Sequence, residues 1–287
     1  MFTCESKCYK LSEDDVECMP YLTHEEADSK IIYRTQAEDT PVVVCAKETD
    51  IFVLLVYARS QTNPQSPWIL QIDKQQFVDI KKVYDYVGYE VASVLPQFHA
   101  ITGSDSTSYK YNKGKIGALK KLLKDKSLCR YLRSLGVEAT PTPESTNDSL
   151  KFIQCVIYTG DLNETNLESR IYKNLTKKSS DKIPPDEQSA IQDIHRCHFQ
   201  VLIWTHCLKA HVPDYDPELY GWKFDETQKL LLPFWYAGPQ LPPTQNTAMN
   251  SGTLADEPPA KKACVEESLD ESDAASESDD ALQSDDE

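Results

Sequence analysis

The sequence predicts an α/β fold, with a parallel sheet flanked by helices and a mainly helical C-terminal part. Short apolar runs rich in β-branched residues alternate with longer segments in which apolar residues recur at helical spacing. Acidic residues follow the first of these runs directly. In open α/β sheets, ligands bind beyond the carboxyl ends of the strands, so these acids are candidates for a binding site.

The first half of the chain is predicted to alternate between helices and strands. A helix is expected from Thr23 to Thr35, because a threonine at the N-cap position precedes acids and then apolar residues at helical spacing. The run from Pro41 to Ala46 is too short for a helix and is typical of a strand buried on both faces. The elements expected after it are a helix over 51–59, a strand over 68–72, a further element that begins in 77–80, and helices over 84–98 and 115–126.

Composition divides the chain into five segments. Pro, Ser and Thr cluster in residues 138–148, which is typical of a linker, and a long helix is expected over 185–210. Polar residues without periodicity predominate at both ends. The expected segments are a poorly ordered lead-in over 1–20, an α/β core over 21–137, the linker over 138–148, a mainly helical region packed on the core over 149–243, and a disordered acidic tail over 244–287.

The negative charge of the chain is concentrated at one end. The formal net charge is −16, and residues 265–287 contain eleven Asp and Glu and no Lys or Arg. The rest of the chain is therefore close to neutral and can carry a basic patch for phosphate groups. No apolar run is long enough to cross a membrane, and residues 1–10 lack the order of a signal peptide, so a nuclear or cytoplasmic protein is expected. Two lysines in a proline-containing stretch, 258–263, favour the nucleus.

Three groups of acids, far apart in the sequence, can converge at one edge of the predicted sheet. Carboxylate oxygens are the usual protein ligands of Mg²⁺ and Mn²⁺, and two such ions can activate water and stabilise the leaving oxygen of a phosphodiester. A single acid at the start of a helix is more often a capping residue, so the prediction depends on the whole set. The predicted metal ligands and catalytic residues are Glu26, Asp28, Glu48, Asp50 and Asp105.

The motifs around these acids resemble those of PIN-like, flap-endonuclease-type nucleases. The string EAD at 26–28 resembles the Glu-Ala-Glu helix motif of that family, and AKETD at 46–50 resembles its strand-end motif with two acids one residue apart. Residues 95–105 (LPQFHAITGSD) resemble the segment that ends in Gly-Cys-Asp. The resemblance implies a PIN-like sheet and an Mg²⁺- or Mn²⁺-dependent endonuclease or 5′ nuclease that acts on branched or single-stranded nucleic acid.

A glycine-containing segment after the last acid carries the expected nucleic-acid contacts. The string KGKIGA at 113–118 resembles the glycine hairpin of the family's helix-two-turn-helix element, in which backbone amides and lysines hold a DNA phosphate. Three further lysines, at 120, 121 and 124, either extend this contact or form a solvated helix face. The resemblance implies phosphate contacts from Lys113, Gly114, Lys115 and Gly117.

Longer strings resemble a set of uncharacterised animal proteins that are associated with mobile elements. The strings are HEEADSKI, ETDIFVLL, FHAITGSDSTS and NKGK, and this resemblance covers about residues 21–240. Several features depart from the nuclease pattern. Residues 1–20 contain no apolar run ahead of an aspartate, so the first strand of the nuclease core and its acids are expected to be missing. Asp28 stands in place of a glutamate, Ser106 of a tyrosine and Asn112 of a glycine.

Two classes of function follow from these observations. One is the metal-assisted nuclease, and the other is a catalytically inactive module that keeps the fold and binds nucleic acid or a protein. The acidic tail can bind a basic protein partner, screen a basic groove, or keep the chain in solution. The His and Cys residues at 195–198 lie among apolar residues and are better explained as core than as a metal site. His24 and His99, each beside a group of acids, either contact substrate phosphate or satisfy a local hydrogen bond.

Overall fold

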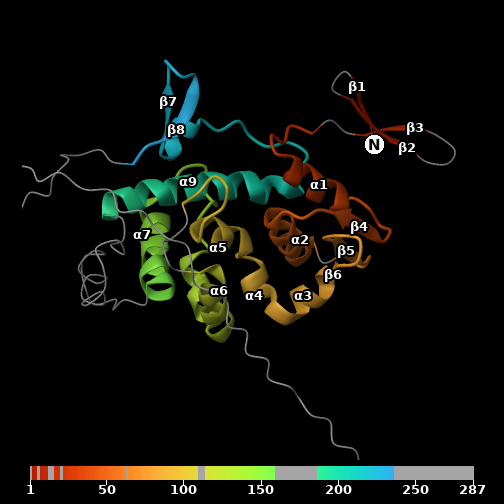
Figure 1. Ribbon diagram of the computed structural model, residues 1–287, viewed down its shortest axis with the longest axis horizontal. Coiled ribbons are helices and arrows are strands. Elements are labelled where there is room, and N and C mark those ends of the chain that lie inside the picture. The colour runs from red at the N-terminus through yellow and green to blue at the C-terminus, as the bar shows by residue number, and fades with distance from the viewer. Residues whose placement is uncertain are drawn as a thin grey trace, which may run out of the picture. The chain divides into compact units, whose positions relative to one another are not determined.

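The computed structural model describes residues 22–62, 64–108, 114–158 and 186–235, together with the backbone of 2–4, 7–11 and 16–19. These residues belong to one compact unit, Met1–Gly238. The described part is a mixed α/β structure dominated by helices, which confirms the predicted α/β class (Figure 1). Among the described residues, no helix is both long enough and apolar enough to span a bilayer.

The helices are α1 (Ala27–Gln36), α2 (Thr49–Thr62), α3 (Ile80–Val87), α4 (Tyr89–Ala92), α5 (Leu95–Ile101), α6 (Lys115–Lys124), η1 (Lys126–Tyr131), α7 (Pro143–Phe152), η2 (Ile153–Ile157), α9 (Glu187–Thr205), η4 (His206–Leu208) and η5 (Pro217–Tyr220). The strands are β1 (Phe2–Cys4), β2 (Lys7–Leu11), β3 (Val16–Met19), β4 (Val42–Cys45), β5 (Trp68–Gln71), β6 (Phe77–Asp79), β7 (Trp222–Asp225) and β8 (Leu230–Pro233).

The sheet nearest the predicted acids has the order β4-β5-β6. Strands β4 and β5 pair in parallel, with Val42 opposite Trp68, whereas β5 and β6 pair antiparallel. The expectation of a purely parallel sheet was therefore wrong for β6. The connection over 72–76 is long enough for a hairpin and too short for the crossover that a parallel pair needs. The Asp73 carboxylate closes this hairpin by accepting the backbone N–H groups of Gln75 and Gln76.

Helix α2 forms the centre of the hydrophobic core. It follows β4 directly, and its middle residues, Val53 to Ala58, are buried on every side of the helix. A helix that is apolar all round must be covered all round, and α2 contacts α1, α3, α4 and α5. The long helix α9 lies across α5 and α7 and supplies further core residues (Figure 1). Helix α9 is thus packed on elements from the first half of the chain.

The single helical segment expected over 84–98 is divided into three helices, α3, α4 and α5. Gly88 ends α3 with a φ of 79°, a left-handed backbone conformation that glycine adopts at little cost. Pro96 lies in the first turn of α5, where a residue without an N–H group is tolerated. The division turns α5 toward α9 and brings the segment after it, 102–108, close to α9.

The stretch 138–148 is not a linker throughout, because α7 begins inside it at Pro143. The hydroxyl of Thr142 accepts the N–H of Ser145, and the hydroxyl of Ser145 accepts the N–H of Thr142, so the helix begins with a reciprocal cap. Pro143 occupies the first helical position, which proline favours. The Thr and Pro residues that indicated a linker are therefore helix-start residues.

Strands near both ends of the described region were not expected from the sequence. Residues 1–20, expected as a poorly ordered lead-in, include β1, β2 and β3, and β2 pairs antiparallel with both of its neighbours. In the region 149–243, expected to be mainly helical, the described residues include the long helix α9 and also the antiparallel hairpin β7–β8. The Asp225 carboxylate accepts the N–H groups of Thr227 and Gln228 and so stabilises the turn of this hairpin. The expected acidic tail over 244–287 lies outside the described residues.

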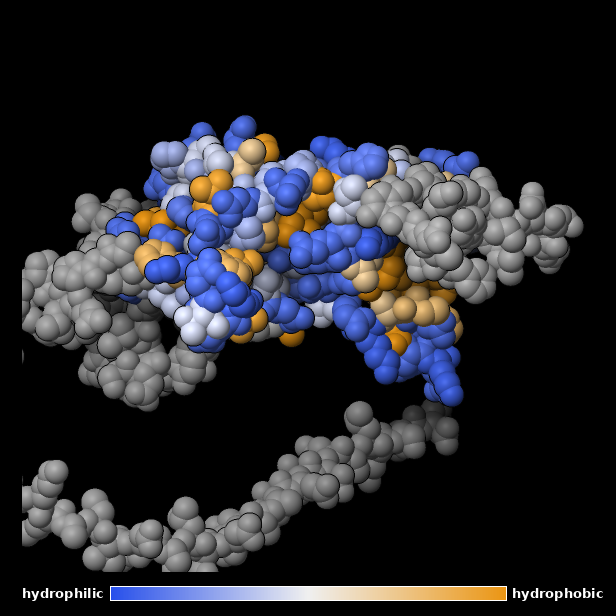
Figure 2. Space-filling view, turned by 90° about the horizontal axis from the view of Figure 1, so that it is seen from above, coloured by the Kyte–Doolittle hydropathy of each residue, from blue (hydrophilic) through white to orange (hydrophobic). Residues whose placement is uncertain are grey.

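The buried guanidinium of Arg196 holds the hairpin to α9. Its Nη1 donates to the carbonyl oxygens of Gly221, at 3.0 Å, and Phe234, at 2.8 Å. Gly221 directly precedes β7 and Phe234 directly follows β8, so both lie at the open end of the hairpin. Its Nη2 donates to Asp193 at 3.4 Å, and its Cζ atom lies 4.3 Å from the ring centre of Trp235. The hairpin itself leaves all four side chains of β8 exposed. On the face seen in Figure 2, hydrophilic residues predominate, with apolar residues in scattered groups between them.

Candidate functional site

The five predicted carboxylates come from three places in the fold. Glu26 is the N-cap residue of α1 and Asp28 lies in the first turn of that helix. Glu48 and Asp50 lie where the chain leaves the carboxyl end of β4 and enters α2. Asp105 lies in the turn that follows α5. Because α2 packs against both α1 and α5, the three places face one another.

Two adjoining pockets collect all five carboxylates. Three of the five, Asp28, Asp50 and Asp105, line both pockets, so the pockets form one continuous site. The first pocket is completed by Glu26, Ala27, Ser106 and Gln200. The second is completed by Lys47, Glu48, Thr49, His99, Ser104 and Lys115. The convergence of distant acids, which the sequence predicted from their order, is present in the fold.

Burial, together with mutual repulsion, disfavours negative charge on two of the acids in this site. Burial raises the pKa of Asp28 above its ordinary value, and the negative charges of Asp50, Glu48 and Asp105 raise it further. Burial likewise raises the pKa of Glu26, and Asp28 and Asp50 add to the shift, while hydrogen bonds from Gln200 and Trp204 oppose it. Both shifts indicate that negative charge in the site is not fully compensated by the protein.

Asp28→Asn is expected to stabilise the folded protein at neutral pH. The variant removes a carboxylate that burial and three neighbouring acids disfavour, and we expect a gain of roughly 0.5 kcal/mol, which is small because the group is half-exposed. Since folding raises the pKa of Asp28, protonation of Asp28 at low pH stabilises the folded wild type and removes the advantage of the variant. The difference in unfolding free energy between variant and wild type should therefore be complete above the raised pKa and vanish below the ordinary value of 3.8.

Urea unfolding of both proteins between pH 3 and pH 8 measures this difference. Asp39→Asn serves as the control, because Asp39 is exposed and lies outside both pockets. A gain in the Asp28 variant that is the same at every pH would contradict the electrostatic cause.

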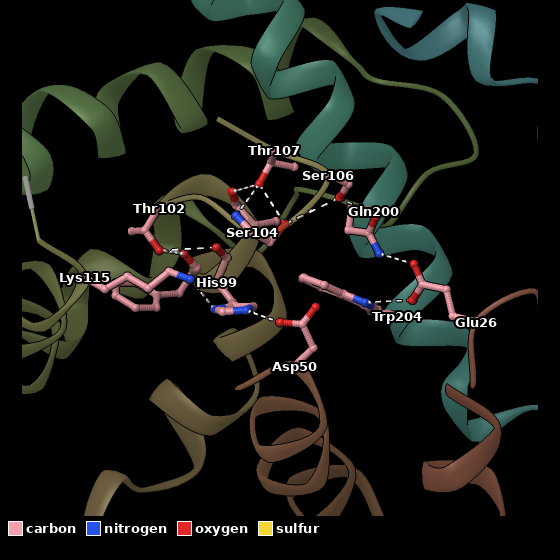
Figure 3. A network of polar contacts seen from close by, with 12 residues as sticks. Glu26, Asp50, His99, Thr102, Ser104, Ser106, Thr107, Lys115, Gln200 and Trp204 are labelled. Atoms are coloured by element: carbon pink, nitrogen blue, oxygen red, sulfur yellow. Dashed lines mark hydrogen bonds and ion pairs between the residues drawn. The ribbon is translucent and has the colours of Figure 1, made fainter. Parts of the chain in front are cut away.

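Lys115 brings a positive charge to the second pocket. Burial lowers the pKa of its ammonium group to about 8, although Asp50 and Asp105 oppose the shift. Its Nζ donates to Nδ1 of His99 at 2.7 Å, and Nε2 of His99 lies 2.6 Å from Oδ1 of Asp50 (Figure 3). Because an ammonium group can only donate, Nδ1 is the acceptor, and the imidazole proton lies on Nε2 and faces Asp50. Lys115, His99 and Asp50 thus form a continuous hydrogen-bonded row.

The glycines predicted to contact phosphate lie at the start of α6. Gly114 is the N-cap residue and Gly117 lies in the first turn, and both are exposed. A Cβ atom built on either glycine would meet no atom within 4 Å, and the φ of Gly114 is −70°, which any residue can adopt. Packing in this chain therefore does not require glycine at these positions. Lys113 lies outside the described residues.

The other His and Cys residues named in the sequence have structural environments. Both ring nitrogens of His198 are hydrogen-bonded to backbone groups, with Gly136 as a donor and Glu138 as an acceptor. Cys197 is fully buried in the core. Nε2 of His24 donates to the carbonyl oxygen of Lys209 at 2.6 Å. Of the two roles that the sequence allowed for His24, a phosphate contact or a hydrogen bond within the protein, the structure shows the second. His99 differs from these residues, because both of its partners are side chains of the site.

Sequence reasoning missed three polar residues that border the acids: Ser106, Gln200 and Trp204. Gln200 and Trp204 are four residues apart on α9 and share one face, on which they both donate to Glu26. A buried glutamine among the apolar residues of a long helix was the available signal. Nothing local in the sequence showed which acid it would meet.

Carboxylate oxygens are the donor set that this site offers to a metal ion. Among the described residues, no group of three or more His, Cys, Asp and Glu side chains is arranged to hold one. The chemistry of the donors does fit a divalent cation. The carboxylates of Asp28 and Asp105 accept no hydrogen bond from any residue that the structure describes, and both line the shared part of the pockets. Their repulsion is the kind that a bound Mg²⁺ or Mn²⁺ relieves.

Comparison of the chain with protein-family models, with curated proteins and with solved structures found no match. What the site can do is therefore argued from its own residues.

Proposed function

We propose that this chain is a PIN-like protein that binds branched or single-stranded nucleic acid at the acidic site and hydrolyses phosphodiester bonds with Mg²⁺ or Mn²⁺. The observation that carries the proposal is the convergence of carboxylates from α1, the β4–α2 connection and the turn after α5 on one continuous site. Acids that repel one another in this way are costly to a fold, and a bound cation offsets that cost.

Each group in the site has a role in this proposal. Four carboxylates would hold the metal: Asp28, Glu48, Asp50 and Asp105. When bound, the metal supplies Lewis-acid stabilisation of the phosphate and a water of lowered pKa. Lys115 and Lys47 line the same pocket and can bind phosphate oxygens. His99 holds the carboxylate of Asp50 in place through the 2.6 Å hydrogen bond.

The start of α6 supports the nucleic-acid part of the proposal. Helix α6 has ten residues, and its first N–H groups point out of the helix end, where phosphate groups bind favourably. The open space at Gly114 and Gly117 lets a phosphate approach the backbone closely, which a side chain would prevent. Lys115 belongs to this first turn and also reaches the acidic site. A nucleic-acid strand held at α6 therefore passes beside the carboxylates.

The alternative is a catalytically inactive module that keeps the fold and binds nucleic acid or a protein. One observation favours it: several oxygens of the acids are already engaged within the chain. Both carboxylate oxygens of Glu26 and one of Asp50 accept hydrogen bonds from protein side chains. On this alternative the network stabilises the fold, and a partner binds to the surface around it.

Asp105→Asn separates the two functions. Single-stranded and flap DNA and RNA are incubated with the wild type and with this variant in Mg²⁺, Mn²⁺ or EDTA. The nuclease proposal expects metal-dependent cleavage by the wild type and a loss of about 10²-fold or more in the variant, because Asp105 is exposed and its loss leaves the fold intact. Nucleic-acid binding without cleavage by the wild type supports the alternative. Cleavage that survives in Asp105→Asn contradicts the proposal that this acidic site carries the hydrolysis.

A further inference from the structure

We propose that Glu26, Gln200 and Trp204 form a clamp that positions the acidic site, and that Glu26 acts through this clamp and not as a ligand of the metal. The inference deepens the proposed function, since it assigns roles within the same site. It rests on the contacts that α9 makes with Glu26, with Ser106 beside Asp105, and with His99, the partner of Asp50 (Figure 3).

Glu26 differs from the other acids in the way its carboxylate is held. Oε1 accepts Nε2–H of Gln200 at 2.8 Å, and Oε2 accepts Nε1–H of Trp204 at 3.1 Å. Both donors are neutral and almost fully buried. Two donors on two oxygens fix the plane of the carboxylate and direct it toward α9. Asp28 and Asp105, in contrast, accept no hydrogen bond from any described residue and keep their oxygens for a ligand.

Gln200 extends the clamp to the turn that carries Asp105. Its Nε2 donates to Glu26, and its Oε1 accepts the hydroxyl of Ser106 at 2.6 Å. The carboxylate of Glu26 fixes the orientation of the amide, because a carboxylate can only accept and so the amide nitrogen must face it, which leaves the amide oxygen to accept from Ser106. Ser106 directly follows Asp105, so Gln200 holds the backbone of that turn at a set distance from the start of α1.

Trp204 extends the clamp to Asp50. Its ring stacks on the ring of His99, with centres 5.5 Å apart and planes inclined by 29°. His99 in turn donates to Asp50 at 2.6 Å. Since Trp204 is also fixed by its bond to Glu26, the imidazole has one face packed and both nitrogens hydrogen-bonded. A packed ring with two bonds holds the carboxylate of Asp50 in one orientation.

The clamp therefore joins all three groups of acids through two side chains of one helix. Gln200 and Trp204 lie one turn apart on the same face of α9, and that face covers the start of α1, the turn after α5 and His99. Buried polar groups that are all satisfied rigidify their surroundings, whereas a single unpaired group loosens them. Both α9 residues donate to Glu26, so its loss should disturb Asp50 and the turn that carries Asp105, although Glu26 does not contact either of them directly.

An exchange of the two polar side chains tests the clamp. In Glu26→Gln the new amide presents an N–H group to one of the two donors, and in Gln200→Glu two carboxylates face each other. The double variant Glu26→Gln with Gln200→Glu restores every hydrogen bond. Nε2–H of the residue at 26 then donates to the carboxylate at 200, its Oε1 accepts from Trp204, and the second carboxylate oxygen accepts from Ser106. The net charge is that of the wild type.

Binding of Mn²⁺ alone, measured by calorimetry, is the first readout. Each single variant is expected to bind Mn²⁺ about 10- to 100-fold more weakly, as is typical when a group that orients metal ligands is lost. The double variant is expected to recover to within a few-fold of the wild type. If Glu26 is itself a ligand, the double variant stays as weak as Glu26→Gln, and that result overturns the proposal.

The emission of Trp204 is the second readout and needs no metal. It is obtained as the difference between each protein and the same protein with Trp204→Phe. The clamp predicts a shifted emission in both single variants and a return to the wild-type emission in the double variant. If the wild type does not bind Mn²⁺, the proposed function fails, and the clamp is then judged on the emission alone. An emission that is unchanged in the single variants, or not restored in the double variant, overturns the clamp.

Discussion

Asp50→Asn is expected to lower metal-dependent cleavage by about 10²-fold or more without unfolding the protein. Asp50 lines both pockets, and its charge acts on Asp28, on Glu26 and on Lys115. Asparagine keeps an oxygen that can accept Nε2–H of His99, so the variant removes the charge and retains the hydrogen bond. The loss should appear as a lower kcat with Mg²⁺ or Mn²⁺.

The matched control for this variant is Asp39→Asn, which removes a charge of the same kind from an exposed position outside the site. The melting temperature of each protein shows whether the fold is retained. If Asp50→Asn cleaves as well as Asp39→Asn does, the carboxylate is not part of the chemistry, and the nuclease proposal fails for this chain.

Arg196→Met is expected to destabilise the protein by about 3–5 kcal/mol, the usual effect of removing one partner of a buried ion pair. The side chain of Arg196 is 2% exposed and that of its partner Asp193 is 4% exposed. Methionine fills a similar volume but removes the donor that Arg196 supplies to Asp193 and to the carbonyl oxygens of Gly221 and Phe234. Urea unfolding with the two proteins under identical conditions measures the change.

Two further variants test whether the destabilisation comes from the buried ion pair and not simply from the loss of a positive charge. Arg133→Met alters an exposed arginine and should change the unfolding free energy by less than about 0.5 kcal/mol. Asp193→Asn combined with Arg196→Met removes the buried charge that has lost its Arg196 partner in the single variant, and it should recover part of the loss. The recovery stays partial because Asp193 also accepts the backbone N–H of Ser108 at 3.1 Å. A double variant no more stable than Arg196→Met would show that the ion pair is not the cause.

The hydrogen bond to Ser108 links this ion pair to the acidic site. Ser108 is three residues beyond Asp105, and the turn between them is also bonded to Gln200 through Ser106. Helix α9 thus holds the turn at two points. Variants in Asp193 or Arg196 are therefore expected to weaken Mn²⁺ binding as well as the fold, whereas Arg133→Met should change neither.

Local patterns predicted the early elements well and the later ones less well. Strand β4, helix α2 and strand β5 are confirmed because each is an apolar run with clear ends. The expectation that the strand over 41–46 is buried on both faces was wrong, because Val43 is 56% exposed and Cys45 is exposed as well. Helix α7 was missed because its capping residues, Thr142 and Pro143, also occur in loops. The hairpin β7–β8 was missed because its exposed leucines give no alternation between buried and exposed faces.

By itself, the sequence determined which residues could form the acidic site and where in the chain they occur. The order of a helix start, a strand end and a later turn was sufficient, because the carboxyl end of β4 and the helix starts beside it are fixed by local patterns. Only the tertiary structure decided which side chains each acid contacts. The bond between Gln200 and Glu26 joins residues 174 positions apart, and the row from Lys115 through His99 to Asp50 crosses three elements. Such contacts depend on how helices pack against one another, and no local period in a sequence records that packing.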